Sequence, residues 1–307
     1  MIEARGLTKR YPTALAVDDL TFSVHPGHVT GFLGPNGAGK STTMRLILGL
    51  DRPTAGTVTV GGTTYTHHRF PLHEVGALLD AAAVHPGRRA RDHLWCLAQS
   101  NGIARSRVDE VLDVVGLTTV AGQRIGTFSL GMRQRLGIAA ALLGDPAILM
   151  FDEPVNGLDP EGIVWIRTLF RSLADEGRTV FVSSHLMSEM SLTADHVIVI
   201  GRGRLIADAS MRDLLLRGAS HVTVRSPDAT RLATLVVGAG GRIEQERDHT
   251  LLVFDLTAEA VGELAASNAV VLHELTTEKA SLEETFFELT NDSVDFHGDT
   301  VATGGAR

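Results

Sequence analysis

A short glycine-rich segment constrains the fold more than any other feature of this sequence. It reads Gly34-Pro-Asn-Gly-Ala-Gly39-Lys40-Ser41, with two glycines ahead of a lysine and a hydroxyl residue at the spacing of a phosphate-binding loop. The apolar run Val29–Leu33 precedes it and the helical pattern Lys40–Leu50 follows it. Backbone N–H groups of such a loop surround phosphate oxygens, and the helix start adds positive potential. We therefore expect Lys40 to supply a point charge and Ser41 to be a candidate Mg²⁺ ligand.

Composition excludes several other classes of protein. The 307 residues are 44% hydrophobic and 21% charged, which suits a globular chain of about two domains and excludes a disordered one. A single cysteine excludes a disulfide scaffold. No apolar run is long enough to span a membrane, and Met1–Arg5 lacks the basic start of a signal peptide, so we expect a cytoplasmic protein. The net charge of −8 disfavours nucleic acid as a partner.

Residues 1–215 alternate between strand-like and helical patterns, which predicts an α/β domain with a mostly parallel sheet. The expected strands are Val29–Leu33, Val75–Leu79, Ile148–Phe151, Thr179–Ser183 and Val197–Ile200. The expected helices are Lys40–Leu50, Ala90–Ser100, Arg107–Val115, Met132–Leu143 and Glu161–Ala174.

Residues 219–290 change rhythm and predict a small α+β domain of ferredoxin-like βαββαβ order. Its expected elements are His221–Val224, Ala229–Val237, Arg242–Glu246, Leu251–Leu256, Ala258–Ala266 and Val270–Leu275. Ser281-Leu-Glu-Glu284 is a capping box that predicts a last helix toward Leu289. We expect the tail 291–307 to be disordered.

Two further motifs carry chemistry. Asp152 and Glu153 end the apolar run Ile148–Phe151, where buried carboxylates are costly unless they are paired or bind a metal. The functional interpretation gives Asp152 the Mg²⁺ and makes Glu153 the base for an attacking water, whereas the alternative is a solvated strand end. Ser129-Leu-Gly131 opens a predicted helix, and is either an anion-binding start or an ordinary N-cap.

Together these motifs resemble the ATP-binding subunits of ABC transporters, which are P-loop NTPases with a helical subdomain. Tyr11 matches the aromatic residue that stacks on adenine, and Phe128-Ser-Leu-Gly-Met132 takes the place of the Leu-Ser-Gly-Gly-Gln signature. Asn156-Gly-Leu-Asp159 resembles the D-loop, and Ser184-His185 resembles the switch histidine. The C-terminal module looks like that of drug- and antibiotic-exporting members.

The resemblance implies Mg²⁺·ATP as the ligand and a role for each matched residue. The implied nucleotide contacts are Tyr11, Asn36, Gly37, Ala38, Gly39, Lys40, Ser41, Thr42, Ser129 and Gly131. The implied Mg²⁺ ligands are Ser41, Asp80 and Asp152. The implied catalytic residues are Glu153, His185 and Lys40, with Asp159 coupling two sites. For His185 a structural role is the alternative.

The chain departs from the family pattern at two places. Asp80 stands where the family has its Q-loop glutamine, as in the bacitracin-exporter branch, and it accepts hydrogen bonds but cannot donate them as an amide does. In the signature, Leu130 replaces a glycine and Met132 replaces glutamine, while Ser129 and Gly131 remain.

The resemblance also implies partners and a place of work. Two copies would pack head to tail, closing with ATP and opening with ADP, and would drive a separate membrane permease from the cytoplasmic face of the membrane. The expected function is the ATP-hydrolysing subunit of a drug or antibiotic exporter. The alternative is a soluble ABC-type ATPase in DNA repair or translation, although no long coiled-coil insertion and no second ATP-binding half is present. A kinase or GTPase explains neither Ser129-Leu-Gly131 nor Ser184-His185.

Overall fold

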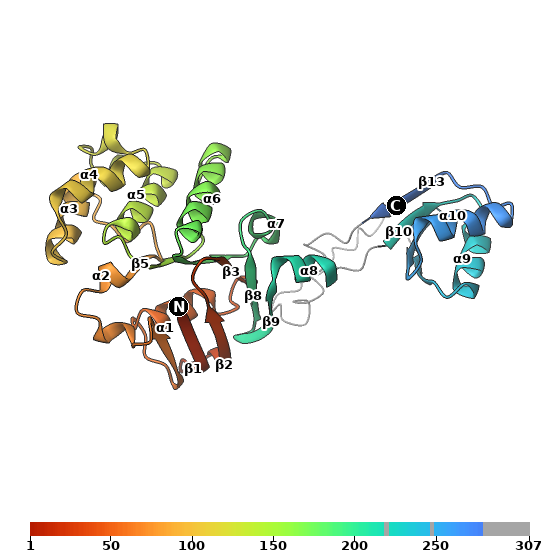
Figure 1. The fold of residues 1–307 in the computed structure, drawn as a ribbon, viewed down its shortest axis with the longest axis horizontal. Helices are drawn as coiled ribbons and strands as arrows, with labels where there is room; N and C mark the ends of the chain where they lie inside the picture. The colour runs from red at the N-terminus through yellow and green to blue at the C-terminus, as the bar shows by residue number, and fades with distance from the viewer. Residues whose placement is uncertain (218–220, 246–248, 279–307) are drawn as a thin grey trace, which may run out of the picture. The chain divides into compact units, whose positions relative to one another are not determined.

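The computed structural model describes residues 1–217, 221–245 and 249–278 (Figure 1). The chain divides into two compact units, of which the first contains Met1–Met211 and the second begins at Arg212. The predicted boundary after residue 215 falls inside the helix α8 (Met211–Arg217). Among the helices of the described ranges, none is both long enough and apolar enough to cross a bilayer. The helix predicted toward Leu289 and the tail 291–307 lie outside the described residues.

A six-stranded sheet forms the centre of the first unit as described. In spatial order its strands are β5 (Val75–Leu78), β6 (Ile148–Phe151), β7 (Thr179–Ser184), β3 (Val29–Leu33), β8 (His196–Gly201) and β9 (Arg204–Ser210). The first five are parallel, and β9 pairs antiparallel with β8. Every residue of β3, β6 and β7 is buried, as expected for a parallel sheet covered on both faces. The five predicted strands are confirmed.

Helices continue from the carboxyl ends of three central strands. After β3 comes α1 (Lys40–Ile47), after β6 comes α6 (Pro160–Asp175), and after β7 comes α7 (Met187–Ser191). Because parallel strands end at the same edge of a sheet, the segments that enter these helices lie together.

A second, antiparallel sheet covers the first, and the sequence patterns did not predict it. Its strands are β2 (Leu15–Val24), β1 (Ile2–Arg10) and β4 (Ala55–Val60). The two sheets share one core, in which the Phe22 ring stacks on Phe32 at 5.7 Å between centroids and Phe32 meets Phe181 at 5.1 Å. This core fixes the strand β3 that leads into the phosphate-binding loop.

The helical subdomain expected from the resemblance lies between β5 and β6. It contains α3 (Ala90–Ser100), α4 (Arg105–Val114) and α5 (Leu130–Leu142), which pack together in Figure 1. Shorter elements are the helix α2 (Pro71–Glu74) and the 3₁₀ turns Tyr65–His67, Thr118–Val120 and Ile125–Thr127.

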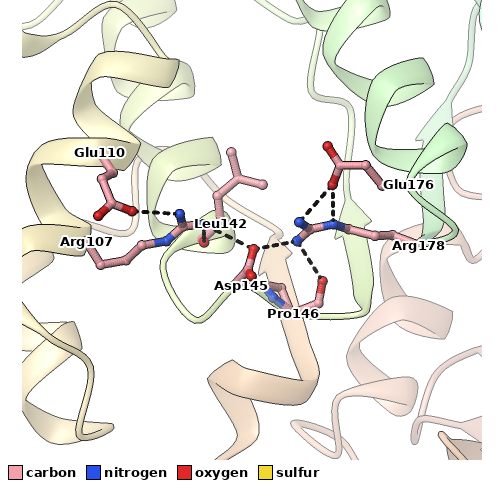
Figure 2. Close-up of polar contacts among 7 residues, drawn as sticks. All are labelled: Arg107, Glu110, Leu142, Asp145, Pro146, Glu176 and Arg178. Carbon is pink, nitrogen blue, oxygen red and sulfur yellow. Dashed lines mark hydrogen bonds and ion pairs between the residues drawn. The ribbon is translucent and has the colours of Figure 1, made fainter.

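An ion-pair network joins these helices to the central sheet. Arg107 on α4 donates to Asp145 Oδ1 at 3.2 Å, and Arg178 donates to the same oxygen at 2.9 Å (Figure 2). The two arginines also reach Glu110, Leu142 O, Pro146 O and Glu176. Asp145 lies in the loop from α5 to β6, so the network holds the start of β6, the strand that Asp152 follows.

The second unit has the predicted ferredoxin-like order. Its described elements are β10 (His221–Arg225), α9 (Ala229–Gly238), β11 (Arg242–Gln245), β12 (Thr250–Phe254), α10 (Ala258–Ser267) and β13 (Glu274–Glu278). The strands lie in the order β11-β12-β10-β13 and all pair antiparallel. Valine and leucine side chains from the sheet and from α9 and α10 form its core.

One predicted strand was misplaced. The apolar run Val270–Leu275 suggested a strand, but β13 is Glu274–Glu278. Ala269 adopts a left-handed conformation (φ 54°), and the Val270 N–H donates to Ala265 O at 2.9 Å. Val270 is therefore buried because it closes the end of α10, not because it lies in the sheet.

Candidate functional site

The loop between β3 and α1 presents backbone N–H groups to an anion. Gly37 and Gly39 have φ of 84° and 102°, in the left-handed region that glycine adopts readily. A Cβ atom on Gly39 would lie 2.3 Å from Ala16 O, so a larger residue does not fit. Within the described chain, no side chain caps the start of α1, and its first turn contains no acidic residue. The first N–H groups of α1 are therefore available to a phosphate.

Lys40 lies buried beneath this loop. Its Nζ donates to Gly34 O at 2.6 Å and to Pro35 O at 3.2 Å, and it lies 3.6 Å from Glu153 Oε1. Burial lowers the pKa of Lys40 from its ordinary value of 10.5, and the carboxylates of Glu153 and Asp152 oppose that shift. A cavity of about 240 Å³ lies over the loop and is lined by Ala16, Pro35, Asn36, Gly37, Gly39, Lys40, Ser41, Thr42 and Glu153.

The end of β6 brings three predicted catalytic residues into contact. Glu153 Oε2 lies 2.8 Å from His185 Nδ1, and its other oxygen faces Lys40. Because a carboxylate only accepts, Nδ1 of His185 carries the proton and donates it. The side chains of Glu153 and His185 are 20% and 35% exposed, so both reach solvent, and Glu153 also lines the cavity. The structure thus joins Lys40, Glu153 and His185 from three separate strand ends.

Ser183, at the end of β7, links Asp152 to Glu153 and was missed from the sequence. Its hydroxyl donates to Asp152 Oδ1, and its oxygen accepts the Glu153 N–H at 3.0 Å. Gln134, which is buried on α5, was also missed, and its amide donates to Glu153 O at 3.2 Å. For Ser183 the available signal was a hydroxyl residue after the apolar run 180–182, whereas Gln134 stands between two arginines and gave no such signal.

The donors near the loop fit a Mg²⁺ ion. Mg²⁺ prefers oxygen ligands and in nucleotide sites takes one or two carboxylates together with phosphates and water. Ser41 is exposed at the first turn of α1, and within the described residues Asp152 Oδ2 has no hydrogen-bond partner. Asp80 is exposed just beyond β5, beside β6, and its Oδ1 accepts the Ala82 N–H at 2.7 Å.

Tyr11 lies near the loop but outside the cavity lining. Its hydroxyl donates to Asp51 Oδ2 at 3.2 Å, and Arg45 Nε donates to the same oxygen at 2.7 Å. Burial and the bond to Asp51 raise the pKa of Tyr11 above 10.0. The Lys9 ammonium lies 5.0 Å from the ring centroid. The ring is thus held at its edge and on one face.

The signature and D-loop segments lie against each other. The side chain of Leu130 packs on Gly157, and Gly131 lies close to Gly157 O. Ser129 is the N-cap of α5, where its Oγ accepts the Met132 N–H at 3.2 Å. Asp159 is the N-cap of α6, where its Oδ1 accepts the Gly162 N–H at 2.8 Å. Both caps are exposed, and neither lines the cavity of the described chain.

Known proteins share this sequence and fold. The ABC transporter family model matches residues 17–156, and a domain family of unknown function matches residues 220–283. The chain is 36% identical to the bacitracin transport ATP-binding protein BcrA of Bacillus licheniformis, over 94% of this chain and 97% of BcrA. It is 34% identical to the lantibiotic transport ATP-binding protein SrtF of Streptococcus pyogenes, over 68% of this chain and 90% of SrtF.

Solved structures agree. The ATP-binding subunit of an ABC transporter matches with a TM-score of 0.65 and 24% identity, over 71% of this chain and 92% of that one. A dimeric ATP-binding cassette bound to ADP and Pi matches with a TM-score of 0.64 and 25% identity, over 69% and 99%. These findings favour a transporter subunit over the non-transport alternative. The chain therefore belongs to the family of ATP-binding subunits of ABC transporters and is an ATPase.

Proposed function

We propose that this subunit binds Mg²⁺·ATP over the phosphate-binding loop and powers export of an antibiotic through a separate permease. The observation that carries the proposal is that Glu153 contacts both Lys40 and His185, and that Lys40 and Glu153 line one cavity. Bacitracin and lantibiotic transport, named for two relatives, supports an antibiotic as cargo.

In the proposed reaction a water oxygen attacks the γ-phosphorus and the bond to the ADP oxygen breaks. Glu153 takes the proton of the water, since its carboxylate faces the cavity and only accepts. The Nδ1–H of His185 orients that carboxylate, and a protonated ring would also donate from Nε2 to a γ-phosphate oxygen. The loop N–H groups and Lys40 hold the phosphates. Mg²⁺, held by Ser41, Asp152 and Asp80, supplies charge neutralisation when bound.

The other proposed contacts bind the adenine ring and a second copy of the chain. Tyr11 stacks on adenine with the face that Lys9 leaves open. Ser129 and Gly131 of a second copy complete the γ-phosphate site, because α5 begins there and an N-terminus attracts anions. Asp159 couples the two sites. The pair works at the cytoplasmic face of the membrane, against the permease.

Glu153→Gln tests this proposal, with Glu263→Gln as a control at an exposed carboxylate of the second unit. The first variant should bind ATP, form a stable dimer with Mg²⁺·ATP in light scattering, and release almost no phosphate. The control should turn over like the parent. Brisk hydrolysis by Glu153→Gln would remove Glu153 from the base role, and a persistent monomer, alone and with the permease, would remove the nucleotide-bridged dimer.

A further inference from the structure

Glu153 has an unusual backbone conformation at the point where chemistry is proposed. Its φ is 48°, in the left-handed region, although it is not a glycine and follows a buried strand. Residues with a side chain adopt this conformation at a cost, and they keep it only where their surroundings hold it. The backbone at Glu153 decides where its carboxylate points, so whatever holds that backbone positions the proposed base.

Two buried side chains hold this backbone, one at the N–H and the other at the C=O of Glu153. The Glu153 N–H donates to Ser183 Oγ at 3.0 Å. The Glu153 C=O accepts from Gln134 Nε2 at 3.2 Å, in addition to the local N–H of Asn156 at 3.2 Å. Ser183 is fully buried and Gln134 is 4% exposed. Burying a hydroxyl and an amide costs free energy unless they are hydrogen-bonded, and here each of them makes a hydrogen bond with Glu153.

The two side chains differ in what else they touch. A serine hydroxyl has one proton, and Ser183 gives it to Asp152 Oδ1 while accepting from Glu153. Ser183 therefore orients both carboxylate residues. Among the described residues, the side chain of Gln134 bonds the backbone of Glu153 alone, and it does so from α5, the helix that begins after Ser129.

We propose that Ser183 and Gln134 are positioning residues for hydrolysis, which together hold the left-handed backbone that points Glu153 at the γ-phosphate. Ser183 in addition holds the carboxylate of Asp152 for the metal. The inference rests on the proposed role of Glu153 as the base. It also joins the predicted signature to the base within one chain, since α5 carries Ser129 at its start and Gln134 in its second turn.

The test compares Gln134→Met, which keeps the size of the side chain without the amide, with Gln134→Glu, which accepts but cannot donate. Both should lower kcat by about tenfold to a hundredfold, because a misplaced catalytic group costs that much, and leave ATP affinity near that of the parent. Thr179→Val is the control. It removes a buried hydroxyl from β7, the strand that carries Ser183, but at the opposite end of that strand, and it should leave kcat unchanged. Thermal melts establish that each variant is folded.

A metal-binding measurement, which needs no ATP hydrolysis, distinguishes the role of Ser183 from that of Gln134. Mn²⁺ titrated with ADP and followed by electron paramagnetic resonance reports the metal site. Ser183→Ala should weaken Mn²⁺ binding by about tenfold to a hundredfold, as losses of ligand-orienting partners do. The Gln134 variants should bind Mn²⁺ like the parent. Equal Mn²⁺ affinity in Ser183→Ala would refute the role at Asp152.

A double-variant comparison decides whether Gln134 acts through Glu153. In a Glu153→Gln chain, adding Gln134→Met should lower the residual turnover no further, because the positioned group is already gone. A folded Gln134→Met with parental kcat, or one that loses the same factor in both backgrounds, would overturn the inference. Brisk turnover of Glu153→Gln alone would instead overturn the proposed function.

Discussion

Ser129 offers a way to separate the stability of a helix from the binding of a phosphate. Its Oγ accepts the Met132 N–H at 3.2 Å and caps α5. Aspartate caps a helix about as well as serine does, so Ser129→Asp should keep the fold and its melting temperature. Ser129→Ala removes the cap and should cost about 1 kcal/mol, or roughly 2–4 °C of melting temperature in a unit of this size.

In dimer formation the order should be reversed: Ser129→Asp, which keeps the melting temperature, should weaken the dimer more than Ser129→Ala does. The new carboxylate at position 129 would face the γ-phosphate bound by the second copy, and two like unit charges about 4 Å apart repel by about 4 kcal/mol near a protein surface. The head-to-tail dimer contains this contact twice, so the repulsion totals about 8 kcal/mol. Since about 1.4 kcal/mol is tenfold, the dimer dissociation constant should rise by roughly five orders of magnitude or more. The dissociation constant is measured by sedimentation equilibrium with Mg²⁺·ATP, with each Ser129 substitution made in the Glu153→Gln chain. Parental dimer affinity in Ser129→Asp, or a melting temperature as low as that of Ser129→Ala, would refute the reasoning.

Three further outcomes follow from particular contacts. Asp159→Asn should keep the cap and the melting temperature and should lower the Hill coefficient of ATP hydrolysis. Asp159→Ala should lower the Hill coefficient too, and should also melt about 2–4 °C lower. An unchanged Hill coefficient in both variants would contradict coupling through the carboxylate. Gly76→Ala places a Cβ atom 1.9 Å from Ala141 O, so β5 and α5 must separate and urea unfolding should show a loss of about 1–3 kcal/mol, with parental stability as the refuting result. Phe181→Ala empties the buried ring contact and should cost about 3–5 kcal/mol in the same assay; less than about 1 kcal/mol would show that the ring is not central to the core.

The parallel sheet was predictable, whereas the antiparallel sheet was not, and the difference is physical. Strands buried on both faces read as continuous apolar runs, as Ile148–Phe151 does. The strand β1 instead shifts register at several points and passes through Gly6 with φ 57°, so its alternation of buried and exposed residues is broken. Two-residue periodicity then gives no clear signal, and pairing with distant β4 decides the structure.

The residues of the site also divide into those that could be predicted from the sequence and those that could not. That Lys40, Glu153 and His185 would lie close together follows from parallel strands whose carboxyl ends share one edge. That Ser183 and Gln134 serve Glu153 does not, because each bonds the backbone of that residue, and any residue type has the same backbone groups. A sequence identifies the side chains that carry chemistry more readily than those that hold a main-chain conformation.

The unpaired N–H groups at the starts of α1, α5 and α6 have different hydrogen-bond partners, and the differences match the proposed roles. In the described chain, α1 follows a glycine and has no side-chain cap, so its first N–H groups are left for a phosphate. A neutral hydroxyl caps α5, which satisfies one N–H without adding charge, and the proton of Ser129 remains available to an oxygen of the ligand. A carboxylate caps α6, and its charge repels a phosphate. Asp159 therefore fits a role in contacts between protein groups, whereas the starts of α1 and α5 fit the γ-phosphate.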